Sequence, residues 1–208
     1  MLQVQAEAFG QTPEGVEVTQ YWLTNSHGMR VGLINLGATV TAVEVPDRAG
    51  TLANVTLNFP DLSGYLLNKP YFGGICGRYA NRLASGKFTY VSPAGEEGYP
   101  GALTTVVTYA LNDDDELRLD YEATTDAPTV LNLTNHCYWN LAGARQGTIL
   151  DHELTLFCSK YLPVDEGAIP TGELAPVADT CMDFLTPHPI GERIDQTVNG
   201  AGGYDHCY

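Results

Sequence analysis

Basic residues are scarce in this sequence. Only 10 of the 208 residues are lysine or arginine, against 25 aspartates and glutamates, and the formal net charge at pH 7 is −15. Nucleic acids and anionic membrane surfaces are bound through clusters of basic side chains, so the composition argues against both partners. An uncharged small molecule is the ligand class that this charge balance favours.

Segments that would target the chain to a membrane are not found either. The sequence contains no run of about 18 apolar residues, the length that spans a bilayer. Residues Met1–Gln5 lack the basic and apolar regions of a secretory signal. We therefore expect a cytoplasmic protein that makes no membrane contact.

Metal and redox motifs are also missing. The cysteines are scattered without Cys-x-x-Cys spacing, and the histidines form no His-x-x-x-His pair. Free thiols, no metal site and no cofactor are therefore expected. The acidic run at 113–116 lacks the glycine and terminal glutamate of an EF-hand loop, which favours a solvated turn over a calcium site.

Turn-forming residues divide the sequence into short segments in which apolar and polar residues alternate. The alternation has the period of half-buried strands. It predicts one all-β domain over residues 1–208, a large antiparallel β-sandwich with few short helices. The segments predicted as strands are 18–23, 29–34, 39–45, 53–59, 104–109, 116–123 and 153–157. A single helical turn is expected at 62–67.

The stretch Asn132–Leu141 places one histidine in a strand-like run of amides and aromatics. If the run is extended, His136 and Tyr138 lie on the same face as Asn132 and Thr134. An unperturbed imidazole titrates near pH ~6.5, so His136 is a candidate general acid or base. A structural histidine in a strand is the alternative, and composition alone does not decide between the two.

The same stretch resembles the active-site motif of the aldose 1-epimerases (galactose mutarotases), Asn-x-Thr-Asn-His-x-Tyr-aromatic-Asn-Leu, at every fixed position. Other segments resemble family motifs in family order along the chain. They are Gly77–Arg82, Ser92–Gly101, Tyr161–Asp165, Ile169–Glu173 and Gly202–His206. Several ordered motifs are more specific than one, so the resemblance favours a catalytic His136. It implies the galactose mutarotase-like supersandwich fold.

What the resemblance implies is the interconversion of the α and β anomers of a free aldose of the galactose or glucose type. In the family, a histidine that matches His136 acts as general acid on the ring oxygen. A glutamate removes the proton of the anomeric hydroxyl, and the ring opens and recloses. The partner implied is therefore a small neutral aldose, and no cofactor is needed.

Sugar-binding positions follow from the same motifs. Asn81 and Arg82 match residues that hydrogen-bond sugar hydroxyls, and an arginine fork can hold two oxygens at once. By the same resemblance, Arg78, Tyr138 and Asp205 would belong to the same wall of the site.

Two parts of the family pattern have no match in this sequence. The family carries Asn-x-Leu-His-Gly-Gly where residues 88–91 run directly into Ser92, and its base glutamate comes from strands that follow the Gly-Gly-Tyr-Asp-His motif. No glutamate here occupies a matching position. We therefore expect a domain that lacks an internal segment near 87–91 and the C-terminal strands.

Two other functions remain open at this point. A non-catalytic carbohydrate-binding or sensor domain would keep the sugar site without the base. A hexose-6-phosphate epimerase would need a cationic phosphate pocket, which the scarcity of basic residues disfavours. A monomer or a homodimer is expected.

Overall fold

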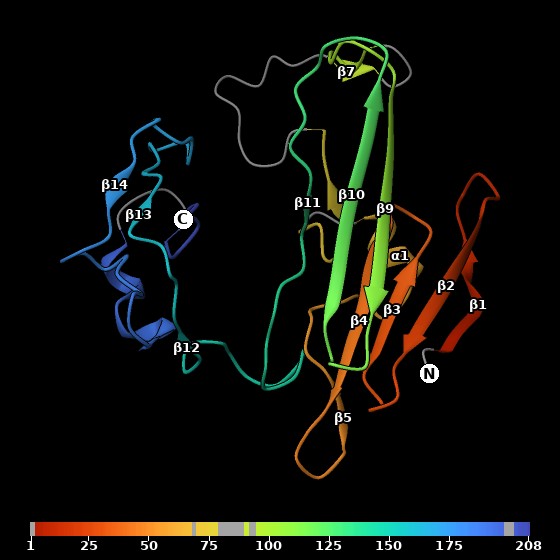
Figure 1. Ribbon diagram of the computed structural model, residues 1–208, viewed down its shortest axis with the longest axis horizontal. Coiled ribbons are helices and arrows are strands. Elements are labelled where there is room, and N and C mark those ends of the chain that lie inside the picture. The colour runs from red at the N-terminus through yellow and green to blue at the C-terminus, as the bar shows by residue number, and fades with distance from the viewer. Residues whose placement is uncertain (1–2, 68–69, 79–89, 92–94, 198–201) are drawn as a thin grey trace. The chain divides into compact units, whose positions relative to one another are not determined.

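The computed structural model describes residues 3–67, 70–78, 90–91, 95–197 and 202–208 (Figure 1). Among these, the residues up to 146 form one compact unit and those from 147 onward form another, which we call the first and the second unit. Helical structure in the described residues is limited to α1 (Leu62–Leu66) and the short 3-10 helices η1 (Ile190–Glu192) and η2 (Ile194–Gln196). None of these helices is long and apolar enough to cross a membrane. The predicted all-β class is confirmed.

The first unit is built on an antiparallel sheet of five strands that pair in chain order (Figure 1). The strands are β1 (Gln3–Gln11), β2 (Glu17–Thr24), β3 (Arg30–Ile34), β4 (Thr39–Pro46) and β5 (Leu52–Asn54). A long hairpin follows, formed by β9 (Leu103–Leu111) and β10 (Leu117–Thr125). The strands predicted at 18–23, 29–34, 39–45, 104–109 and 116–123 are thereby confirmed.

Each face of the five-stranded sheet carries its own apolar cluster. Val31 and Ile34 on β3 are an odd number of residues apart, so they point to opposite faces. Val31 belongs to a cluster that includes Leu111 of β9, whereas Ile34 packs with Leu62 and Tyr65 of α1. The β9–β10 hairpin therefore covers one face of the sheet and α1 covers part of the other. Asp61 caps α1 by accepting from the backbone N–H groups of Ser63 and Gly64.

Two predicted strands are too long. Of the segment 53–59 only the first two residues are in β5, and of 153–157 only β12 (Glu153–Leu154) is a strand. In the first case the Oδ1 atom of Asn54 accepts hydrogen bonds from Val43 N at 2.9 Å and from Thr56 N at 3.2 Å. A side-chain oxygen thus replaces the backbone partner and ends the ladder.

The remaining strands are pairs of two residues each. In the first unit β6 (Ile75–Cys76) pairs with β11 (Thr134–Asn135), and β7 (Tyr90–Val91) pairs with β8 (Glu96–Glu97). In the second unit β12 pairs with β15 (His188–Pro189), and β13 (Lys160–Tyr161) pairs with β14 (Ala175–Pro176). The buried apolar residues described in the second unit are Val164, Val177, Met182 and Phe184.

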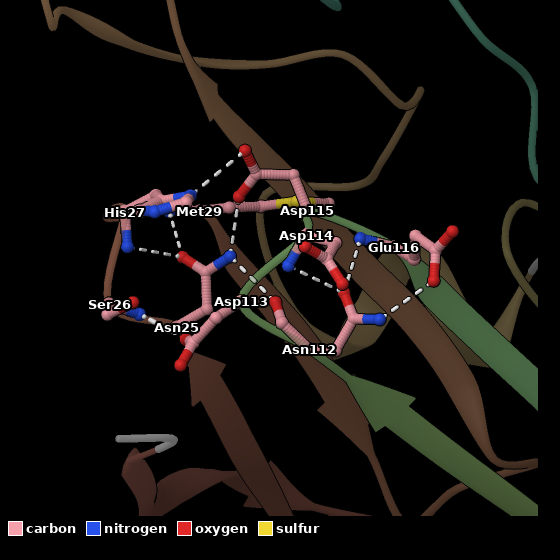
Figure 2. A network of polar contacts seen from close by, with 9 residues as sticks. All are labelled: Asn25, Ser26, His27, Met29, Asn112, Asp113, Asp114, Asp115 and Glu116. Carbon is pink, nitrogen blue, oxygen red and sulfur yellow. Dashed lines mark hydrogen bonds and ion pairs between the residues drawn. The ribbon is translucent and has the colours of Figure 1, made fainter.

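The β2–β3 and β9–β10 turns are joined by a polar network (Figure 2). Buried Asn25 donates from Nδ2 to the Asn112 carbonyl at 2.9 Å and to Asp115 Oδ1 at 2.6 Å, while its Oδ1 accepts from Met29 N. Asp113 Oδ1 accepts from the backbone N–H of Ser26 at 2.9 Å. The acidic run thus forms a turn that fastens the hairpin to the sheet.

This network makes stability depend on acid through Asp113. The backbone N–H of Ser26 holds the pKa of the Asp113 carboxyl below its usual value of 3.8. Because the folded pKa is lower than the unfolded one, the ionised group stabilises the fold above about pH 4, and that stabilisation is lost as the pH falls through the folded pKa. Asp113→Asn keeps an acceptor oxygen but does not titrate. Its midpoint of thermal unfolding should therefore fall less between pH 7 and pH 3 than that of the wild type.

Asp114→Asn is the matched control, since the Asp114 carboxylate makes no hydrogen bond among the described residues. It should follow the wild-type acid dependence. Equal acid sensitivity of Asp113→Asn and wild type in calorimetric melts would contradict this role of Asp113.

Candidate active site

The backbone around His136 is held by the segment 71–76 that runs beside it. Gly73 N donates to the His136 carbonyl at 3.1 Å, and His136 N donates to the Gly74 carbonyl at 2.9 Å. Asn135 Nδ2 adds a bond to the Gly73 carbonyl at 3.1 Å. The same carbonyl accepts from Val40 N at 2.9 Å, which ties the segment to β4. His136 therefore stands on a backbone fixed by a buried strand of the sheet.

The imidazole of His136 is half-buried and lies among aromatic rings. Its centroid is 5.1 Å from the Tyr138 ring and 6.1 Å from the Tyr71 ring, which meets it edge-on. The Nδ1 atom is buried and has no hydrogen-bond partner among the described residues. Nε2 is consequently the ring nitrogen that is left to contact a ligand.

Alternation along the motif is only partly realised. The strand β11 covers two residues, and it ends where Asn135 Oδ1 accepts from Cys137 N at 3.1 Å. His136 and exposed Tyr138 still lie on one side, as predicted. Cys137 packs against the apolar cluster that includes Val31, and burial raises the pKa of its thiol. Cys137 is therefore a packing residue and a poor nucleophile.

The sequence motifs missed Tyr71 and Phe72, which extend the aromatic surface. Phe72 contacts Tyr138 at 5.4 Å between centroids and also Phe59 at 5.0 Å. Tyr71 is 59% exposed and has a φ of 58°, a left-handed conformation that is rare for an aromatic residue. The available signal was the run of two aromatics followed by Gly73 and Gly74, the kind of pair that permits a tight turn.

Arg78 lies deep in the first unit. It is 3% exposed, and its guanidinium donates to the carbonyls of Gly101 at 2.9 Å and Pro100 at 3.2 Å. The group also lies 5.8 Å from the Tyr99 ring centroid. Through these contacts Arg78 anchors the 99–101 turn. The sugar-binding role expected for Arg78 stays a prediction.

The roles expected for Asn81, Arg82 and Asp205 stay predictions. Asn81 and Arg82 lie outside the described residues. Asp205 belongs to the second unit, where it is exposed and its backbone N–H donates to His206 Nδ1 at 3.3 Å. Among the described residues, no group of three or more His, Cys, Asp or Glu side chains is placed to hold a metal ion.

Comparison with known families decides what kind of protein this is. The sequence model of the family described as aldose 1-epimerase matches residues 19–91 and 87–208, nearly the whole chain. This chain belongs to the aldose 1-epimerase family. Galactose mutarotase from Homo sapiens is 39% identical to this family member over an alignment that spans 100% of the chain and 72% of the human protein. Aldose 1-epimerase from Escherichia coli K12 is 30% identical and spans 94% of the chain and 69% of that protein.

Solved structures agree on the fold of this aldose 1-epimerase family member. Galactose 1-epimerase from Lactobacillus acidophilus NCFM superposes with a TM-score of 0.83 at 24% identity, over 99% of this chain and 73% of that one. A GalM/aldose epimerase homologue from C. elegans gives 0.73 at 27% identity, over 80% and 63%. The predicted β-sandwich is thereby confirmed. The human alignment runs over 250 positions, more than the 208 residues of this chain, so that relative has residues with no counterpart here.

Proposed function

We propose that this chain interconverts the α and β anomers of a free aldose and that His136 is its general acid. Membership of the aldose 1-epimerase family supports this type of reaction. The assignment of His136 is supported by the Tyr138 and Tyr71 rings beside its imidazole and by the fixed backbone on which it stands. Galactose, which the names of related proteins contain, is the first substrate proposed, and glucose is the second.

The chemistry needs one proton to be given and one to be taken. Protonated His136 donates from Nε2 to the ring oxygen as the bond between that oxygen and C1 breaks, and the anomeric hydroxyl loses its proton to become the aldehyde. Rotation about C1–C2 and reclosure on the other face of the carbonyl, with the protons returned, gives the opposite anomer. No electrons are transferred to or from the sugar, so no redox cofactor enters.

His136 supplies the acid half of the reaction. The anomeric proton passes to a general base, the role that the aldose 1-epimerase family gives to a glutamate. General acid catalysis by one positioned group contributes about 10²-fold to 10⁴-fold. We expect His136 to contribute a factor of that order.

Sugar contacts are proposed for Tyr138, Asn81, Arg82 and Asp205. The case for a sugar contact is strongest for Tyr138, because this residue is 42% exposed and its ring lies beside His136. An aromatic ring can cover the apolar face of a pyranose while its hydroxyl contacts the sugar's edge.

The domain boundaries and the setting of the protein are also proposals. The two stretches matched by the family model overlap at 87–91, which supports an absent internal segment at that point within a single domain over 1–208. A cytoplasmic location, a monomer or homodimer, and no contact with nucleic acid or membranes complete the proposal.

A polarimeter tests the function. Freshly dissolved α-D-galactose should reach its anomeric equilibrium faster with micromolar chain than in buffer, and heat-unfolded chain should give no acceleration. Saturable galactose binding in a calorimeter without any acceleration would contradict the enzymatic proposal and would indicate a non-catalytic sugar-binding domain.

A further inference from the structure

A cavity of about 660 Å³ opens on the α1 face of the five-stranded sheet. Gln20 and Trp22 on β2 line it, and they share the face of Val18, which packs against α1. His136 does not line this cavity. Its walls come from β1, β2, β4 and β5, from residues 58–60 and from the loop 142–146. The cavity therefore has its own set of side chains, of which Phe59 also contacts Phe72 of the aromatic surface beside His136.

The floor of the cavity depends on Gly32. A Cβ at this position would lie 2.8 Å from Thr41 Oγ1, 3.0 Å from Gln20 Nε2 and 3.1 Å from the Trp22 ring. The first two atoms are themselves joined by a 2.6 Å hydrogen bond. Because Gly32 has no side chain, Gln20 and Trp22 of β2 can approach Thr41 of β4 above β3.

Several amide groups on the cavity wall have no partner among the described residues. Gln20 is 7% exposed and uses only Nε2, which leaves its Oε1 without a donor. Asn54 uses only Oδ1, and the side-chain amide of half-buried Asn58 makes no hydrogen bond. An amide offers donors and an acceptor, as a sugar hydroxyl does, so the two groups are complementary. Partly buried polar groups without partners favour a ligand that supplies them.

Charge on the wall favours a neutral ligand. Glu44 is paired with Arg30 at 3.3 Å, and the Arg30 guanidinium lies 4.3 Å from the centroid of the Trp22 ring. The loop contributes one exposed cation, Arg145. A carboxylate on the wall and the net charge of −15 both oppose an anion.

We propose that this cavity binds a neutral sugar, as a second carbohydrate site that is separate from His136. Aromatic rings of Phe9, Trp22 and Phe59 supply apolar contact, and the amides of Gln20, Asn54 and Asn58 supply hydrogen bonds to hydroxyls. The volume lies within the range of about 300 to 1,000 Å³ that is typical of small-molecule pockets. This inference does not rest on the proposed catalytic function.

Trp22 provides a built-in reporter for the test. The chain has two tryptophans, Trp22 in the cavity wall and Trp139 outside it. In a Trp139→Phe background, Trp22 emission should change saturably with D-galactose, D-glucose or lactose, with a dissociation constant of about 1 mM. Asn58→Leu removes the amide at similar volume and should weaken binding at least about tenfold. Gly32→Ala should weaken it too, because its Cβ displaces the floor residues.

Gln11→Leu, an exposed amide of β1 outside the cavity, is the matched control and should bind as the background does. No emission change with any of the three sugars would overturn the proposal. So would unchanged binding in both Asn58→Leu and Gly32→Ala, tighter binding of D-glucuronate than of D-glucose, or loss of the Trp22 response in His136→Ala. Retention of the response in His136→Ala supports a separate site whether or not the chain accelerates mutarotation.

Discussion

Gly73→Ala should cost this protein most of its stability. The new Cβ would lie 2.0 Å from the carbonyl oxygen of Val40, a distance at which the backbone must move. Val40 is 1% exposed and belongs to the main apolar cluster of the sheet, so it has little room to yield. Gly73 also has a φ of 66°, a conformation that alanine adopts only with strain.

We expect the free energy of unfolding to fall by more than about 4 kcal/mol, since a backbone clash in a buried turn belongs to the most damaging class of substitution. That is a large fraction of the roughly 5 to 15 kcal/mol of a typical domain. The measurement is a urea titration followed by circular dichroism. Because Gly73 N donates to the His136 carbonyl, any folded remainder should also have a displaced imidazole.

The neighbouring glycine supplies a matched control. A Cβ on Gly74 would meet its nearest atom at 3.6 Å, an ordinary contact, and Gly74 does not have a positive φ. Gly74→Ala should therefore shift the urea midpoint only slightly. Equal midpoints for Gly73→Ala and Gly74→Ala would mean that segment 71–76 does not approach β4 as described.

The sheet could be predicted because its signal is local. Along β9 the exposure alternates from residue to residue, and four of the five less exposed positions, 103, 107, 109 and 111, are apolar. Strand ends were missed where a side chain replaces a backbone partner, as Asn54 and Asn135 do. Alternation carries no information about such bonds, since they depend on one amide rotamer.

The candidate site was predicted less completely than the sheet. Which of its residues are buried, and which contact one another, depends on segments that are distant in the sequence. Motif resemblance identified His136 and Tyr138, which the structure places side by side. The resemblance could not show that Arg78 is buried against the 99–101 turn. Nor could it show that Gly73 packs directly against the Val40 carbonyl. The cavity over Gly32 is equally hidden in the sequence. It depends on the pairing of three strands and on the irregular register between β3 and β4.

His136→Ala should remove almost all of the chain's acceleration of mutarotation. The substitution deletes the proposed proton donor, and water is a weaker and unpositioned acid. Loss of one positioned proton donor lowers a rate by about 10²-fold to 10⁴-fold. The fold should survive, because the backbone bonds of residue 136 to Gly73 and Gly74 do not involve the side chain.

His27→Ala is the control, since it also deletes an imidazole of the first unit, one whose side chain is 57% exposed and faces Asp115 instead of the aromatic site. Circular dichroism melts of both variants show whether either has lost its fold.

The decisive measurement is the polarimetric rate with fresh α-D-galactose for wild type, His136→Ala and His27→Ala at equal concentration of folded chain. We predict that His27→Ala retains the wild-type acceleration and that His136→Ala approaches the buffer rate. A folded His136→Ala variant that accelerates mutarotation as the wild type does would contradict the account.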